Sequence, residues 1–188
     1  CNCDLIETFL PVNTFDEVLE HLKGKCKMNL DRSIGIIEPV MKMVRRHGME
    51  DQILMKSDPS EQSLKLIEAY APDIDYMPIF MEEDHASEKI EKMKIHYAGA
   101  ELVFKTEQSP IVQEAYLEEQ KKKGRVLWGN AILYSSRVPL AGGHSDDISL
   151  LEDPAQGWGW LAQKGFDIIQ TDWAMHCVNY LRENNYRK

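Results

Sequence analysis

The feature that most constrains the fold is a repeated unit of helix, glycine, apolar strand and second helix. Its clearest copy is residues 164–179, KGFDIIQTDWAMHCVN. There Gly165 ends a helix, residues 166–170 predict a strand, and a polar turn opens a helix expected to bury Trp173 and Cys177. A strand this apolar is covered on both faces, which is typical of a parallel sheet with helices packed outside it.

The same unit recurs along the chain. Strands are predicted at residues 26–31, 52–56, 76–81, 101–105, 125–130 and 166–170. The first five begin about 24 to 26 residues apart, and strands alternating with helices at such a period predict an α/β fold with a parallel sheet. A helix over residues 14–22, with a Thr14–Glu17 capping box, is expected before the first strand. The helices expected between strands include one over residues 87–98, ended by Gly99, and one over residues 156–164.

Six strands allow two layouts. A complete (β/α)8 barrel needs eight units and typically ~250 residues, whereas this chain has 188. The chain is therefore an open doubly wound sheet or a TIM-barrel-like parallel barrel with about six of its eight units. The helix over residues 14–22 favours the barrel, because it resembles the end of a unit whose strand precedes Cys1.

The prediction is thus a single domain over residues 1–188, a (β/α) barrel that lacks its first two β/α units. Such a barrel leaves two unpaired strand edges, at residues 26–31 and 166–170. Open edges pair readily with other chains. We therefore expect self-association through them.

Charge and hydropathy limit the kinds of molecule that the chain can bind. A net charge of -9 argues against nucleic acid, which needs a basic face, but allows a small phosphorylated substrate held by local cations. No apolar run is long enough to cross a bilayer. The chain starts at Cys1 without a methionine, so an upstream segment is expected. Cys1 fits either the lipidated first residue of an extracytoplasmic bacterial lipoprotein or an ordinary residue of a cytoplasmic protein.

Ligands of both layouts bind at the carboxyl ends of the strands. The candidate residues there are Asp31, Lys56, Lys105, Trp128 and Asn130. A carboxylate, two lysines, a tryptophan and an amide on one rim suit a metal-assisted site for an anionic organic substrate. Four of the five also have a structural interpretation: Asp31 as a helix cap, the two lysines as solvated side chains, and Trp128 as core. No histidine lies at a clear strand end.

Three segments together resemble the C-terminal part of the glycerophosphodiester phosphodiesterase family. Residues 12–31, VNTFDEVLEHLKGKCKMNLD, are similar to a helix leading into a strand that ends in a metal-binding Glu-x-Lys. Residues 126–130, VLWGN, resemble a Trp-Thr-x-Asn strand, and residues 165–173, GFDIIQTDW, resemble the ending Gly-x-Asp-Gly-Ile-x-Thr-Asp-x-Pro. The order and spacing of the three segments also fit.

The resemblance implies a (β/α)8 barrel that hydrolyses glycerophosphodiesters to an alcohol and glycerol 3-phosphate with a divalent cation, Mg²⁺ or Ca²⁺. Asp31 then takes the place of a metal-binding acid. Ser33 stands where the family has lysine, so Lys56 is expected to replace that cation, and Asn130 or Ala131 falls near the family's asparagine.

The family's catalytic His-Arg-Gly, its Glu-Asn-Thr, its metal-binding Glu-x-Asp and its second catalytic histidine have no match here. The catalytic residues therefore stay unassigned, and this chain alone is expected not to turn over substrate.

Two alternatives remain open. One is a noncatalytic barrel relative that binds a polyol phosphate. The other is an unrelated doubly wound α/β binding domain. The absence of a glycine-rich phosphate loop after any predicted strand argues against this alternative.

Overall fold

The computed structural model describes residues 10–133 and 138–186. Cys1, for which the sequence allows lipidation, lies outside the described residues. No helix in the described ranges has the length and hydropathy that crossing a bilayer requires.

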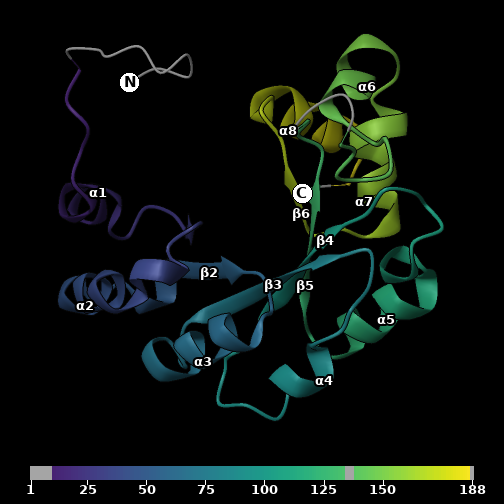
Figure 1. Ribbon diagram of the computed structural model, residues 1–188. Helices are drawn as coiled ribbons and strands as arrows, with labels where there is room; N and C mark the ends of the chain where they lie inside the picture. The colour runs from purple at the N-terminus through teal and green to yellow at the C-terminus, as the bar shows by residue number, and fades with distance from the viewer. Residues whose placement is uncertain (1–9, 134–137, 187–188) are drawn as a thin grey trace.

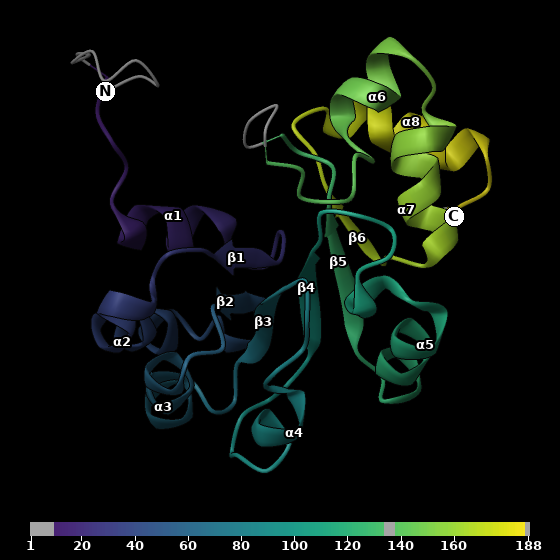
Figure 2. The same ribbon diagram turned by 45° about the vertical axis from the view of Figure 1, so that its right-hand side comes forward.

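Six strands form one sheet in the order β1-β2-β3-β4-β5-β6, and every neighbouring pair is parallel. The strands are β1 (Met28–Leu30), β2 (Ile53–Ser57), β3 (Asp75–Met81), β4 (Gly99–Val103), β5 (Val126–Asn130) and β6 (Ile168–Gln170). The sheet curls into a half-barrel (Figures 1 and 2). The predicted TIM-barrel-like α/β fold with six β/α units is therefore confirmed. A doubly wound sheet is wrong, because its strand order reverses at a switch point and this order does not.

Helices connect the strands and follow one another around the outside of the sheet (Figure 2). The α-helices are α1 (Phe15–Leu22), α2 (Ile37–His47), α3 (Glu61–Tyr70), α4 (Ser87–Ile90), α5 (Glu114–Lys122), α6 (Asp146–Leu151), α7 (Trp160–Lys164) and α8 (Ala174–Glu183). Short 3-10 turns lie at Ile34–Ile36, Glu50–Gln52 and Pro110–Val112, and a π-helical turn lies at Ala155–Gly159.

Local sequence signals set several of these boundaries. The capping box predicted at the start of α1 is present, with Thr14 and Glu17 bonded reciprocally. At the other end of the chain, Gly165 has φ 91 and ends α7 in the left-handed region, where a side chain is strained.

Alternate residues of each strand serve different functions. One set packs under the helices and forms the main core, including Ile53, Met55, Phe80, Leu102 and Leu127. The other set faces the concave side of the sheet, where its polar members line a cavity at the carboxyl ends of the strands. Burial of the apolar face stabilises the fold, and the polar face provides the candidate site.

Three predictions about single elements are wrong. The helix expected over residues 87–98 ends at Ile90. Gly99 does not end a helix but begins β4, where an added Cβ would lie 2.3 Å from the Val126 carbonyl oxygen, so the close strand approach requires glycine. Trp173, expected in the core, is 48% exposed.

Candidate functional site

A cavity of about 460 Å³ lies at the carboxyl ends of the strands. Each of the six strands lines the cavity with residues near its carboxyl end or in the loop that follows, and β6 contributes its last residue. The lining residues are Asn29, Asp31, Arg32, Ile34, Lys56, Ser57, Asp58, Ile79, Glu101, Val103, Asn130, Ile132, Leu140 and Gln170. This is the end of a parallel α/β sheet at which ligands bind.

The floor of the cavity is a buried polar cluster. Lys56 Nζ donates to Glu101 Oε2 at 2.6 Å, and Asn130 Nδ2 donates to Glu101 Oε1 at 2.8 Å. The three residues are only 4%, 7% and 2% exposed, respectively. Lys56 extends from β2 past β3 to reach β4, which the curl of the sheet allows. Both carboxylate oxygens of Glu101 are thus occupied, and one buried charge neutralises the other.

Trp128 covers this ion pair. The Lys56 ammonium lies 3.9 Å from the centroid of the Trp128 ring, which is a cation–π contact. The indole Nε1 donates to Gln170 Oε1 at 3.2 Å, which fixes the ring between β5 and β6. Trp128 therefore orients Lys56.

A second buried pair supports the end of β2. The Ser57 and Tyr76 hydroxyls lie 3.0 Å apart, within hydrogen-bonding distance. Burial raises the pKa of Tyr76 to about 12, although the hydrogen bond to Ser57 opposes that shift. Tyr76 thus stays neutral and supports the strand end without adding charge.

The rim carries both signs of charge. Asp31 follows β1 and is exposed, and its Oδ2 lies 3.9 Å from Arg32 Nε. The φ of Arg32 is 52, which is unusual for a residue with a side chain. Asp31 is not a helix cap, since Ser33 precedes the next helical turn. Asp58 is already engaged, because it accepts hydrogen bonds from Ser60 and Ser63.

The structure thus gathers four of the five sequence-predicted residues. Asp31, Lys56 and Asn130 line the cavity, and Trp128 contacts Lys56. Lys105 does not line the cavity. It is exposed beyond the end of β4, and its backbone N–H donates to Glu82 Oε1 at 2.9 Å.

Sequence reasoning missed Glu101 and gave Gln170 no specific role. The sequence predicts a helix end at Gly99 and so puts Glu101 at the start of its strand, far from the rim. A signal was present: Glu101 stands between Ala100 and Leu102, both fully buried, so a lone carboxylate projects from the interior of a buried strand. Such a charge requires a buried partner.

The start of α6 is fixed by a carboxylate that the sequence analysis does not single out. Asp146, 4% exposed, accepts hydrogen bonds from Trp158 Nε1 at 2.7 Å, Thr171 Oγ1 at 2.7 Å and the Asp172 backbone at 2.9 Å. Thr171 and Asp172 of the GFDIIQTDW segment therefore anchor α6 to the end of β6. Asp172 itself does not cap α8, which has Trp173 before its first residue.

The described residues do not by themselves fit a divalent cation. Mg²⁺ and Ca²⁺ require six or more oxygen ligands. Among residues 10–133 and 138–186, no group of three or more histidine, cysteine, aspartate or glutamate side chains is close enough to hold a metal ion. Glu101 and Asp58 are engaged, which leaves Asp31 as the carboxylate with room for a ligand.

Histidine, the most frequent general acid or base in enzymes, does not line the cavity. All six histidines fall within the described ranges, and none of them lines it. The arrangement is suited to binding: a fixed ammonium, a fixed amide and a rim arginine can hold an anionic, hydroxyl-bearing ligand.

Two solved structures resemble the chain in fold. A glycerophosphoryl diester phosphodiesterase from Parabacteroides distasonis has a TM-score of 0.70 at 16% identity, over 91% of this chain and 55% of the other. A protein described as a candidate glycerophosphodiester phosphodiesterase from Galdieria sulphuraria has a TM-score of 0.60 at 14% identity, over 89% of this chain and 63% of the other. The chain thus spans little more than half the length of these proteins, and identities this low establish the fold alone.

No curated protein sequence matches the chain significantly. A family profile does match, over residues 76–181, which is more than half of the 188 residues. That segment covers β4 to β6 and all of β3 except Asp75. It contains Glu101, Asn130 and Gln170 of the cavity lining, and Trp128, which contacts Lys56. The chain belongs to the family DUF4996, described as a domain of unknown function.

Proposed function

We propose that this chain binds the phosphate ester of a glycerophosphodiester in the concave-face cavity, as part of a barrel that hydrolyses such esters to an alcohol and glycerol 3-phosphate. One observation carries the proposal. The buried Lys56 ammonium, held by Glu101 and Trp128, stands at the carboxyl ends of the strands in a fold shared with a glycerophosphoryl diester phosphodiesterase.

The contacts available to a ligand suit a phosphate ester of a polyol. An ammonium has three N–H donors, and among the described residues Lys56 uses one of them, toward Glu101. Besides its contact with the Trp128 ring, the ammonium can donate to a phosphate oxygen. Arg32 at the rim adds a planar donor that suits phosphate. Asn130 Oδ1 accepts no hydrogen bond from the described residues and is available to a glycerol hydroxyl.

Hydrolysis needs more than the described residues supply. We propose that two further β/α units complete the barrel and provide the general acid and base. A divalent cation, Mg²⁺ or Ca²⁺, would use Asp31 as one ligand and take its others from outside residues 10–133 and 138–186. Residues 1–188 alone should then bind the ester without cleaving it.

A noncatalytic relative that binds a polyol phosphate is the second candidate. The observation in its favour is that no histidine lines the cavity. The two candidates agree on the ligand and differ in what the rest of the barrel supplies.

Calorimetric titration with glycerol 3-phosphate tests the shared claim, with glycerol and inorganic phosphate as partial ligands. We expect glycerol 3-phosphate to bind more tightly than either. Lack of saturable binding at millimolar concentrations would overturn the proposal.

Hydrolysis separates the two candidates. Release of glycerol 3-phosphate from glycerophosphodiesters should be absent for residues 1–188. For the full-length gene product, EDTA-sensitive release supports the enzyme, and persistent absence supports the binding protein. Asp31→Ala should abolish the EDTA-sensitive activity. Asp51→Ala, an exposed acid beside the opposite end of β2, should leave it unchanged. Full activity in Asp31→Ala would remove Asp31 from the metal site.

A further inference from the structure

Gln170, the last residue of β6, carries a side-chain amide of fixed orientation at the concave-face cavity. Its Oε1 accepts a hydrogen bond from Trp128 Nε1 at 3.2 Å. Because an indole N–H can only donate, the oxygen of this amide must face Trp128, and the NH₂ group must face elsewhere. Trp128 therefore engages one half of the Gln170 amide and leaves the other half, a donor, for a different partner.

This NH₂ group is accessible to a ligand. Every buried side-chain nitrogen or oxygen in residues 10–133 and 138–186 has a hydrogen-bond partner. Gln170 Nε2 donates to none of those residues, so it is not one of the buried atoms. Gln170 is half-buried and lines the cavity, so a molecule bound there can accept a hydrogen bond from it.

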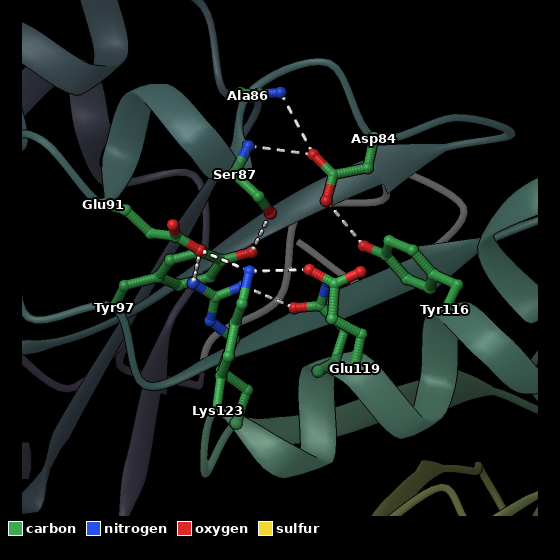
Figure 3. A network of polar contacts seen from close by, with 10 residues as sticks. Asp84, Ala86, Ser87, Glu91, Tyr97, Tyr116, Glu119 and Lys123 are labelled. Atoms are coloured by element: carbon green, nitrogen blue, oxygen red, sulfur yellow. Dashed lines mark hydrogen bonds and ion pairs between the residues drawn. The ribbon is translucent and has the colours of Figure 1, made fainter.

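The polar groups on the outer side of the sheet differ, because they bind one another. Figure 3 shows the network between α4 and α5, in which Asp84 accepts from the Ser87 N–H at 2.9 Å and from the Tyr116 hydroxyl at 2.8 Å. These contacts join the two helices and account for the network as a structural support. Gln170 is bonded within the protein through its oxygen only.

The backbone holds Gln170 firmly. Its carbonyl oxygen accepts hydrogen bonds from the N–H groups of Ala131 at 2.8 Å and Ile132 at 3.2 Å. The next residue, Thr171, donates through its hydroxyl to the buried Asp146 carboxylate at 2.7 Å. A donor fixed in this way loses little conformational freedom when a ligand binds, so its hydrogen bond contributes more to affinity.

The Gln170 amide also lies within reach of a short ligand whose phosphate contacts Lys56. Trp128 connects the two residues, since the Lys56 ammonium lies 3.9 Å from the centroid of its ring and Gln170 Oε1 lies 3.2 Å from its Nε1. The ammonium is over the face of the indole and the amide is at its edge. The two donors can therefore contact different parts of one small molecule.

From the free amide donor and its place near Lys56, we propose that Gln170 determines specificity for the polyol part of the ligand, by donating a hydrogen bond from Nε2 to a hydroxyl oxygen. This inference rests on the proposed function, because Lys56 must hold the phosphate for Gln170 to contact the polyol. An alkyl phosphate of the same length would leave the amide donor without a partner, which lowers its affinity.

A cycle of two ligands and two proteins tests this contact. Glycerol 3-phosphate has two free hydroxyls, and propyl phosphate has the same carbon chain with none. Calorimetric titration of residues 1–188 gives the ratio of the two affinities, which should be about three- to ten-fold smaller in Gln170→Met than in the wild-type protein, as expected for one net hydrogen bond. Loss of the Trp128 contact affects the Lys56 site for both phosphates alike, so it cancels in the ratio.

Gln163→Met is the matched control, because it removes an exposed amide of α7 that does not line the cavity. The affinity ratio of this variant should equal that of the wild-type protein. A second measurement uses the wild-type fold itself. In ¹H–¹⁵N NMR spectra, the side-chain NH₂ resonance of Gln170, assigned by its loss in Gln170→Met, should shift saturably with glycerol 3-phosphate and much less with propyl phosphate.

The outcomes separate this inference from the proposed function. If glycerol 3-phosphate binds the wild-type protein but the affinity ratio is the same in Gln170→Met, the role of Gln170 is overturned and the proposed function stands. An equal shift of the Gln170 resonance with both ligands would also overturn it. If glycerol 3-phosphate does not bind the wild-type protein, the proposed function fails, and the role of Gln170 fails with it.

Discussion

Replacing Lys56 with methionine tests whether the floor of the concave-face cavity is a coupled ion pair. Lys56 and Glu101 are 4% and 7% exposed, and their charged atoms lie 2.6 Å apart. Lys56→Met keeps an unbranched side chain one atom shorter, removes the ammonium, and leaves the buried Glu101 carboxylate with Asn130 as its remaining partner among the described residues. Removing one partner of a buried pair costs about 3–5 kcal/mol. Glu101→Gln should cost a similar amount, because it leaves the ammonium without its anion.

The double variant, Lys56→Met with Glu101→Gln, removes both charges together. Its loss of unfolding free energy should fall below the sum of the single losses by about 2 kcal/mol or more, since no charge is left buried and unpaired. Urea unfolding followed by circular dichroism gives the four free energies, provided that the denaturant slopes agree. The reasoning is refuted if the losses add to within about 0.5 kcal/mol, or if Lys56→Met costs less than about 1 kcal/mol.

Three further predictions concern the fold. Gly99→Ala should lower the free energy of unfolding by about 1–3 kcal/mol, because its Cβ would lie 2.3 Å from the Val126 carbonyl oxygen. Gly35→Ala, whose Cβ would have nothing within 4 Å, should not lower it. Equal thermal midpoints for the two variants would contradict this prediction. Hydrogen bonds from Arg45 lower the pKa of Asp73 below its usual 3.8, so their stabilisation is present above that pH and lost as pH falls through the folded-state value. Asp73→Asn should therefore flatten the acid limb of the stability profile, and an unchanged limb would count against the pair. Among the described residues β1 and β6 are the outermost strands of the sheet, and their edges should produce dimers or larger species that increase with concentration in sedimentation velocity; a monomer at every concentration would exclude pairing through them.

Much of the architecture could be predicted from the period of the strands. Each predicted strand lies within two residues of the observed one at its start, because parallel strands buried on both faces have continuous apolar runs. The prediction of a helix over residues 87–98 is wrong because the end of this segment forms backbone hydrogen bonds with a residue far away in the sequence. The Tyr76 N–H donates to the His96 carbonyl, and the Ala98 N–H donates to the Tyr76 carbonyl. Residues 96–98 thus pair with the edge of β3, and this pairing overrides an amphipathic pattern.

The candidate site could be predicted only in part. Lys56, Trp128 and Asn130 follow from their places near strand ends, where a parallel sheet collects its ligands. Glu101 does not, because its contact with Lys56 passes over β3 and depends on strand register and sheet curl. A helix end at Gly99 implies a strand over residues 101–105 that ends at Lys105, whereas β4 covers Gly99–Val103 and Lys105 lies outside the cavity.

The central claim is that the Lys56 ammonium contacts the phosphate of the ligand, and its own NMR signal tests this most directly. With ¹⁵N-labelled lysine, the buried Lys56 ammonium should give a resonance that can be assigned by its loss in Lys56→Met. The account predicts that glycerol 3-phosphate shifts this resonance saturably and that glycerol does not. A Lys56 resonance that stays in place while glycerol 3-phosphate binds elsewhere on the protein would contradict it.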